Sequence, residues 1–510
     1  MKSTSLSLIA GTVALAAVTG FAALTAPGDV VAGEAKAAAR LPVERSSLLC
    51  PTPGLSDLAE TTYTSFTPAA GSGGAAGTAE LMPSVSATAG AGDDTTAETE
   101  GKKDKSEKAV SGKSVVSLKK PGRPATAEAS GSDAPALVGT ATGELAPGWT
   151  AQQTTTVSAG ATRGLLGVSC TGPDTNFWFP AASTAKSHED YVHLTNPDDT
   201  AAVADIELYG PDGSLKSDVG EGITVPARSS VPVLISTLTS EVADDVTVHV
   251  TTRTGRVGAV VRAADNETGS DWLAASVDPT GTLVLPGIPA DATDVRLVAF
   301  APGEEDADLT VKLLGKNGAI SPAGHEDLHI KSNMTAGVDL KDVTKGEAGS
   351  LLLTPAESGR ATPVVAALRV VRGTGDKREV AYIPATGPVG AQATVADNRA
   401  KGSTLSLTAP GATGKVKVTA SAGSEGGEQT VQTYTVKAGT TIAVTPPVPA
   451  GLKGGYALTI ETVSGGPVHA ARTLSLPESG IPMFTVQTLP DDGGTVEVPD
   501  AVQDLSVLDY

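Results

Sequence analysis

The sequence predicts an all-β fold: three tandem Ig-like β-sandwich repeats of about 105 residues, preceded by an N-terminal targeting helix and a disordered insert. The main observation is a repeat with a domain-sized period, which is typical of tandem copies of one fold. Prolines and arginines mark this period with spacings of 103 to 108 residues: Pro197, Pro302, Pro410, Arg262, Arg369 and Arg472.

Two local patterns assign the repeat to the β class. In the first copy, Ala204, Ile206 and Leu208 are apolar, and the acidic residues Asp205 and Glu207 lie between them. This period of two is expected of a half-buried strand. The segments that follow such runs read PDG, KNG or SEGG, which tolerate the positive φ of a hairpin turn. Short strands separated by Gly and Pro, without a sustained helical period, predict a two-sheet sandwich.

Residues 1–40 are predicted to be a targeting segment. Lys2 gives a short positive region, and the 21 residues from Leu6 to Ala26 carry no charge. This run is longer than the about 7–15 residues of a cleaved signal and close to the about 20 that span a bilayer. The sequence leaves open a cleaved signal peptide and an uncleaved anchor formed by residues 6–26. Both predict an extracellular or cell-envelope location.

The next two segments differ in composition. Residues 41–66 contain apolar and aromatic positions, and we expect an ordered segment that packs on the first sandwich. Residues 67–140 are rich in Ala, Gly, Ser and Thr, with an acidic block followed by a lysine-rich one. So few apolar side chains do not offset the entropy of ordering the chain, which predicts a disordered insert. The lysines either contact an anionic envelope polymer or lipid or are solvated charge in a linker, and we favour the linker.

The three sandwiches are assigned to residues 141–282, 283–388 and 389–510. Each copy ends in a strand-like run that contains an aromatic residue: DWLAAS (271–276), EVAYIPA (379–385) and GIPMFTVQTL (480–489). The first copy is entered through Phe177, Trp178 and Phe179. If exposed, these rings would form a platform for stacking sugars, whereas buried rings would supply apolar area to the core. We expect burial, because the run leads directly into the repeat.

No catalytic, cofactor-binding or metal-binding residue is expected, and we predict that the protein is not an enzyme. Residues 325–329 (HEDLH) match H-E-x-x-H, whose zinc chemistry requires a helix. They align with strands of the other copies, where the two histidines would lie about 13 Å apart. The recurrent arginines are expected to be structural, for example by hydrogen bonding to loop carbonyls at the end of each sandwich.

The two cysteines of the chain, Cys50 and Cys170, are predicted to form a disulfide. An even number of cysteines in a chain routed to an oxidising compartment favours pairing. Both occur in short apolar runs followed by turn residues, SLLCPTPG and GVSCTGP. The bond would hold residues 41–66 to the first sandwich. Two separate buried thiols are the alternative.

Three segments carry a resemblance to a known family: VERSSLLCP (43–51), RGLLGVSCTGP (163–173) and the run from FWFPAAST to ELYGPDG (177–213). They resemble a secreted or membrane-anchored actinobacterial family of unknown function with tandem β-sandwich units. The resemblance implies an association with the cell envelope. It implies no activity and supplies no catalytic residues.

These observations predict an exported, non-enzymatic cell-envelope protein that acts as a scaffold, spacer or binding module. The alternative is a carbohydrate-binding or accessory protein of envelope glycan metabolism. The expected partners are an envelope glycan or another envelope protein, with membrane contact only through the N-terminal segment. A net charge of −20 argues against nucleic acid, because it repels the phosphates.

Overall fold

The computed structural model describes residues 39–87, except 55 and 70–74, and residues 112–498, except 161, 218 and 357–360. These residues belong to two units. In the smaller unit, β1 (Ala39–Pro42) pairs with β39 (Thr495–Val498) as an antiparallel ribbon with every residue exposed. The larger unit, Val43–Gly494, contains the other described strands. Apart from Ala39 and Arg40, the predicted targeting segment lies outside the described residues.

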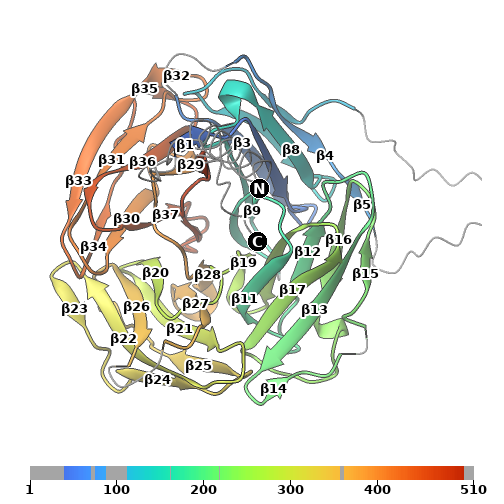
Figure 1. The fold of residues 1–510 in the computed structure, drawn as a ribbon, viewed down its shortest axis with the longest axis vertical. Helices are drawn as coiled ribbons and strands as arrows, with labels where there is room; N and C mark the ends of the chain where they lie inside the picture. The colour runs from blue at the N-terminus through green and yellow to red at the C-terminus, as the bar shows by residue number, and fades with distance from the viewer. Residues whose placement is uncertain are drawn as a thin grey trace, which may run out of the picture. The chain divides into compact units, whose positions relative to one another are not determined.

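The predicted all-β class is confirmed (Figure 1). The only helical segments among the described residues are three short 3-10 helices: η1 (Gly143–Leu145), η2 (Ile235–Thr237) and η3 (Gly375–Lys377). None of the helical segments in the described ranges is long and apolar enough to cross a membrane.

Within the larger unit, the described strands form four sandwiches of eight main strands each (Figure 1). The N-terminal sandwich contains β2 (Arg45–Cys50), β3 (Ala59–Phe66), β4 (Ala79–Pro83), β6 (Val116–Leu118), β7 (Ala125–Ser130), β8 (Leu137–Thr142), β9 (Thr150–Val157) and β10 (Gly164–Ser169). The second contains β11 (Asn176–Ala182), β12 (Tyr191–Thr195), β13 (Ala202–Gly210), β15 (Ile223–Val225), β16 (Ser229–Leu234), β17 (Val246–Thr254), β18 (Gly258–Asp265) and β19 (Gly269–Leu273).

The third sandwich contains β20 (Leu283–Ile288), β21 (Ala292–Phe300), β22 (Ala307–Gly315), β24 (Asp327–Ile330), β25 (Thr335–Asp339), β26 (Gly349–Pro355), β27 (Val365–Arg372) and β28 (Glu379–Pro384). The fourth contains β29 (Gln392–Asn398), β30 (Ser403–Ala409), β31 (Gly414–Ala420), β33 (Thr430–Val436), β34 (Thr440–Val444), β36 (Tyr456–Gly465), β37 (His469–Ser475) and β38 (Phe484–Thr488). Short additional strands are β5 (Val85–Ser86), β14 (Gly213–Ser214), β23 (Gly318–Ile320), β32 (Gly426–Glu428) and β35 (Ala450–Lys453).

All four sandwiches share one strand order. One sheet places the main strands in the order first, sixth, third and fourth, and the other in the order eighth, seventh, second and fifth. An immunoglobulin constant domain pairs its first strand with its second. Here the first strand pairs with the sixth, as β11 does with β17, so the strand order is not that of an immunoglobulin domain.

The N-terminal sandwich corrects the predicted boundaries. Residues 41–66 are not an addition to another sandwich, because β2 and β3 belong to a sandwich of their own. The prediction of a disordered insert over 67–140 is wrong where the chain forms β4, β6, β7 and β8, while 70–74 and 88–111 lie outside the described residues. The sandwich predicted over 141–282 is divided, because β9 and β10 complete the N-terminal sandwich and the second begins at β11.

The physical reason lies in how the N-terminal core is assembled. A few large side chains, among them Tyr63, Leu81 and Leu137, are completely buried together although they are far apart in sequence. Between them are short runs of Ala and Thr whose composition, averaged over the segment, resembles that of a disordered chain. The strand β7, for example, alternates between half-buried and exposed residues. Composition alone did not show that distant segments would bury these few side chains jointly.

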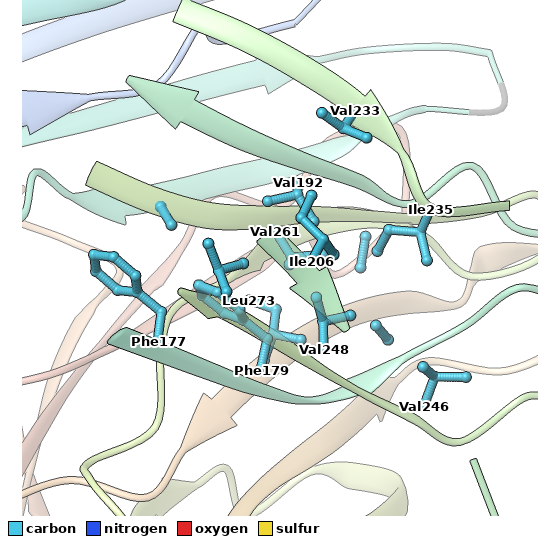
Figure 2. Close-up of a cluster of buried hydrophobic side chains, with 14 of the residues drawn as sticks. Phe177, Phe179, Val192, Ile206, Val233, Ile235, Val246, Val248, Val261 and Leu273 are labelled. Carbon is cyan, nitrogen blue, oxygen red and sulfur yellow. The ribbon is translucent and has the colours of Figure 1, made fainter. Parts of the chain in front are cut away.

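The core of the second sandwich shows how the alternating pattern is used (Figure 2). Ile206 and Val248 from one sheet face Val192 and Val261 from the other, and each is at most 1% exposed. Phe179 adds a buried ring, and burying a side chain of this size contributes about 1.5–3 kcal/mol. The predicted burial of the aromatic entry strand is confirmed, since Phe177 and Trp178 are also only 7% exposed.

Contacts between sandwiches follow one rule. The first strand of each sandwich packs on the second or seventh strand of the next: β11 on β21 and β27, and β20 on β30 and β37. In the same way β2 contacts β18, and β29 closes the circuit by packing on β3 and β9 of the N-terminal sandwich. The eighth strands, β10, β19, β28 and β38, contact one another where the four sandwiches meet.

Candidate functional site

The four eighth strands approach closely enough to require glycine. Gly167 in the middle of β10 donates its amide to Oδ1 of Asp271 in β19 at 3.0 Å. A Cβ atom at position 167 would lie only 2.3 Å from Nε2 of Gln487 in β38. A larger residue would therefore displace the buried side chains of Gln487 and Thr485 or shift β10.

Side chains, rather than a β-ladder, connect these strands. Gln487 donates from Nε2 to the carbonyl of Gly167 at 2.9 Å, and Thr485 donates its hydroxyl to Asp271 at 3.1 Å. Asp271 is completely buried, and this burial raises the pKa of its carboxyl well above the ordinary value. Its second oxygen, Oδ2, has no hydrogen-bond partner among the described residues. A protonated carboxyl fits this environment, because burying an ionised one costs far more.

A second buried carboxyl lies further along the same junction. Glu379 at the start of β28 accepts the amide of Leu165 in β10 at 3.0 Å and is fully buried. Burial raises the pKa of Glu379 to about 8, although the guanidinium groups of Arg163 and Arg372 oppose the shift. Two titratable groups therefore lie at contacts that join different sandwiches.

The recurrent arginines lie in the seventh strands, beside this junction. Arg262, Arg369 and Arg472 occupy equivalent register positions opposite residues of the eighth strand. The expected hydrogen bonds to loop carbonyls are not observed for them among the described residues. Arg262 instead packs its guanidinium on the ring of Tyr191, 4.9 Å from the centroid. Arg472 is 0% exposed, and burial lowers its pKa to about 10.

A pocket of about 480 Å³ opens at the carboxyl ends of the four eighth strands, and we call it the axial pocket. All four sandwiches contribute to its lining, for example through Ser169, Trp272, Tyr382 and Gln487. Pockets of about 300–1,000 Å³ are the usual size for small-ligand sites. The axial pocket is therefore the candidate functional site.

The predicted disulfide forms part of this pocket. Cys50, the last residue of β2, is bonded to Cys170, which directly follows β10, and their Cα atoms are 4.5 Å apart. Cys170 lines the axial pocket. Both cysteines belong to the N-terminal sandwich, so the bond joins its two sheets rather than linking a segment to another sandwich.

The lining of the axial pocket is mostly apolar and uncharged. It includes no Lys, Arg or His side chain from the described residues. The two acidic residues, Asp491 and Asp492, are engaged within the protein. Asp491 accepts the amides of Ala391 and Gly493, and Asp492 accepts Gln392, Thr394 and the amide of Gly494.

Two buried polar atoms of the lining residues lack partners. The indole Nε1 of Trp272 and the hydroxyl of Ser276 have no hydrogen bond within the described part of the chain. The two residues are 2% and 8% exposed. Both atoms are themselves covered by protein atoms, so they are buried groups without partners and are not exposed to the pocket.

A second hollow, of about 720 Å³, lies between the second and third sandwiches. Its lining is strongly charged, but much of this charge is paired within the protein. Arg296 donates to both oxygens of Asp245, and Arg378 donates to Glu267 at 2.7 Å. These ion pairs hold the two sandwiches together, so this hollow is a weaker candidate than the axial pocket.

The HEDLH segment forms no helix. Residues 327–330 are the strand β24, as the alignment with the other copies predicted, and Leu328 and Ile330 are buried whereas His329 is exposed. His329 contacts Asp308 at 2.8 Å rather than His325. No cluster of three or more potential metal ligands is found among the described residues.

Sequence reasoning predicted a short strand before Cys170 but missed that this strand, β10, closes a sandwich of its own, and with it the pocket. The closing runs of three copies were recognised, and they are the strands β19, β28 and β38. RGLLGVS (163–169) is the corresponding run of the N-terminal sandwich, and its Gly164 precedes Gly269 by 105 residues. This spacing was a usable signal, but the run lacks the aromatic residue that marks the other three.

The fold and pocket define an all-β, disulfide-containing protein of consecutive sandwiches joined through their eighth strands. The sequence model of the family DUF5719, a family of unknown function, matches residues 125–447, which is more than half of the chain. The chain belongs to this family, which agrees with the predicted resemblance to a family of unknown function. No curated protein matches it.

Proposed function

We propose that this protein is an exported, non-enzymatic envelope protein that acts as a binding module. The four sandwiches serve as the scaffold, and the axial pocket receives the ligand. The observation that carries the proposal is the pocket itself, to which every sandwich contributes. A site formed on strands of a packed scaffold keeps its geometry without a ligand, which lowers the entropic cost of binding.

The disulfide supports the location outside the cytoplasm. The Cys50–Cys170 bond is compatible with an extracellular protein, since disulfides persist mainly in oxidising compartments. The charge-free run at residues 6–26 is consistent with export. The expected partners are another envelope protein or an envelope glycan.

Carbohydrate binding is the alternative from a different class. Hydroxyl-bearing side chains and two tryptophans, Trp149 and Trp272, line the pocket and favour this alternative. Against it, the two rings are only 3% and 2% exposed, and Phe177 and Phe179 are also buried. None of these rings offers an open face on which a sugar could stack.

The test is ligand capture with and without a blocked pocket. Gly387 lines the pocket, and a Cβ added there would meet no atom within 4 Å. We expect Gly387→Phe to fill the pocket while leaving the fold intact. Gly411→Phe is the matched control, since Gly411 has the same free space but lies on the exposed turn between β30 and β31.

The full chain and both variants would be exposed to fractionated envelope extract, and retained molecules identified by mass spectrometry. We expect one defined molecule to be retained by the wild type and by Gly411→Phe but not by Gly387→Phe. The same molecule should raise the melting temperature of the wild type, because a ligand that binds only the folded state stabilises it. Equal retention by all three proteins would contradict the proposal.

A further inference from the structure

We propose that the ribbon of β1 and β39 docks on the surface of a lipid bilayer through one apolar face. This contact goes beyond the proposed function, because the ribbon belongs to the smaller unit and takes no part in the axial pocket. It also goes beyond a membrane contact of the N-terminal segment alone, since β39 is far from that segment in sequence. Three features support it: the two faces of the ribbon, the charge-free run upstream, and the absence of net charge.

The register of the two strands gives the ribbon two different faces. Residues that pair across an antiparallel ribbon share a face, and neighbours along a strand point to opposite faces. Leu41 pairs with Val496. Ala39 pairs with Val498 two positions along, so all four of these apolar side chains lie on one face. The ribbon is therefore amphipathic, although each strand has only four residues.

The apolar face is uncovered within the described part of the chain. Leu41, Val496 and Val498 are 48%, 47% and 41% exposed. A two-stranded ribbon is at best marginally stable in water by itself, and it gains stability when its apolar face packs against something. We therefore expect a partner on this face.

The position of the ribbon in the chain favours a bilayer as that partner. The charge-free run of residues 6–26 has about the length that spans a bilayer. Only residues 27–38 lie between it and β1, and such a linker extends over no more than about 45 Å. With the run in a bilayer, the ribbon stays close to the lipid surface. Weak apolar contacts become effective at such a high local concentration.

The charge of the ribbon fits contact with the apolar part of the bilayer rather than with anionic head groups. Arg40 donates to Glu497 at 3.2 Å, and these are the only charged side chains of the two strands. The ribbon therefore has no net charge. The whole chain carries a net charge of −20, which repels anionic lipid. The preferred surface is a zwitterionic bilayer such as phosphatidylcholine.

A second copy of the ribbon fits this face less well. A stable protein interface buries about 1,200–2,000 Å² in total. Each ribbon offers only three large apolar side chains, which is too small a face to hold two chains together. On a bilayer the face needs to contribute less, because the charge-free run supplies a separate attachment.

The test compares the two faces of β39 in the full chain. Val496→Cys and Thr495→Cys would each be labelled with an environment-sensitive fluorophore and reconstituted in phosphatidylcholine vesicles. The native cysteines are joined in a disulfide, so only the new thiol reacts. Both positions are exposed, so the labels should leave the fold and the melting temperature unchanged.

Lipids with brominated acyl chains then report contact, because bromine quenches a fluorophore that lies against it. We expect quenching at position 496 to be about twofold or more that at position 495, since neighbouring residues of a strand point to opposite faces. Replacing part of the lipid by anionic phosphatidylglycerol should not increase the quenching. Val498→Cys and Glu497→Cys repeat the comparison one pair further along the strand.

Equal quenching on the two faces, or no quenching on either, would overturn the inference. A blue-shifted fluorophore at position 496 that brominated lipid does not quench would also overturn it, because protein would then cover the face. If that shift depended on protein concentration, the partner would be a second copy; if not, it would be another segment of this chain. None of these outcomes involves the axial pocket, so the proposed function is tested separately by Gly387→Phe.

Discussion

At the scale of single residues, Glu379 couples the stability of the protein to pH. The pKa of its carboxyl is raised to about 8 in the folded state because it is buried. A raised pKa means that the folded state holds the proton more tightly than the unfolded state. The resulting stabilisation is complete below the ordinary pKa of a glutamate, about 4.3, and is lost as the pH rises through about 8.

We therefore predict that the melting temperature falls between pH 5 and pH 9, and that Glu379→Gln reduces this fall. In the wild type, the free energy of unfolding is expected to fall by an amount on the order of a few kcal/mol over this range, since one pKa unit corresponds to about 1.4 kcal/mol. Thermal unfolding across this pH range measures it. Glu478→Gln, at an exposed position, is the control, and its melting temperature should fall with pH as steeply as that of the wild type. If the melting temperature of Glu379→Gln fell with pH as steeply as that of the wild type, the pH dependence would not come from Glu379.

The second residue-scale prediction concerns the Cys50–Cys170 disulfide, which closes a sequence separation of 120 residues. In the chain-entropy model, closing a loop of this size stabilises the folded state by about 4–5 kcal/mol. Replacing both cysteines by alanine should lower the free energy of unfolding by up to this amount, as measured by denaturant titration. Mass mapping of the purified full chain without reductant should show the bond. Two free thiols would contradict the Cys50–Cys170 bond.

At the scale of elements, the strand β24 prevents the HEDLH segment from forming the helix that a zinc site of this pattern requires. The strand directs Leu328 and Ile330 into the core, so His329 points to solvent. We predict that purified protein contains no stoichiometric zinc and that His325→Ala leaves the melting temperature unchanged. Metal analysis by mass spectrometry tests this. Zinc bound near one per chain and lost in His325→Ala would contradict the prediction.

Also at this scale, the eighth strands show why sequence reasoning stopped short of the site. Alternating polarity and turn residues predicted strands in three copies, because they report directly on one half-buried face. β10 is different, since Leu165 and Leu166 are both buried and face opposite sides. Its glycines at 164 and 167 are explained by contacts with Ser270 and Gln487, residues of other sandwiches. No local pattern encodes such contacts.

At the scale of the whole larger unit, contacts between sandwiches predict cooperative unfolding. Trp178 of the second sandwich stacks with Phe300 of the third, their ring centroids 5.5 Å apart. Arg123 of the N-terminal sandwich donates to Gly423 of the fourth at 3.1 Å. Because each sandwich is held by two neighbours, we expect one main calorimetric transition for Val43–Gly494. Four separate transitions would contradict this, and Trp178→Ala should shift the main transition to a lower temperature.

The sequence by itself determined the all-β class, the position of most strands in the three recognised copies, the buried aromatic entry and the pairing of the cysteines. These features depend on local periodicity, turn chemistry and residue type. Only the tertiary structure decided the fourth sandwich, the closed circuit of contacts and the axial pocket. Each of these arises from residues far apart in the chain, such as Ser169, Trp272 and Gln487, whose proximity depends on how complete sandwiches pack. Burial at that junction also sets the pKa of Glu379, and the composition of a segment contains no information about such burial.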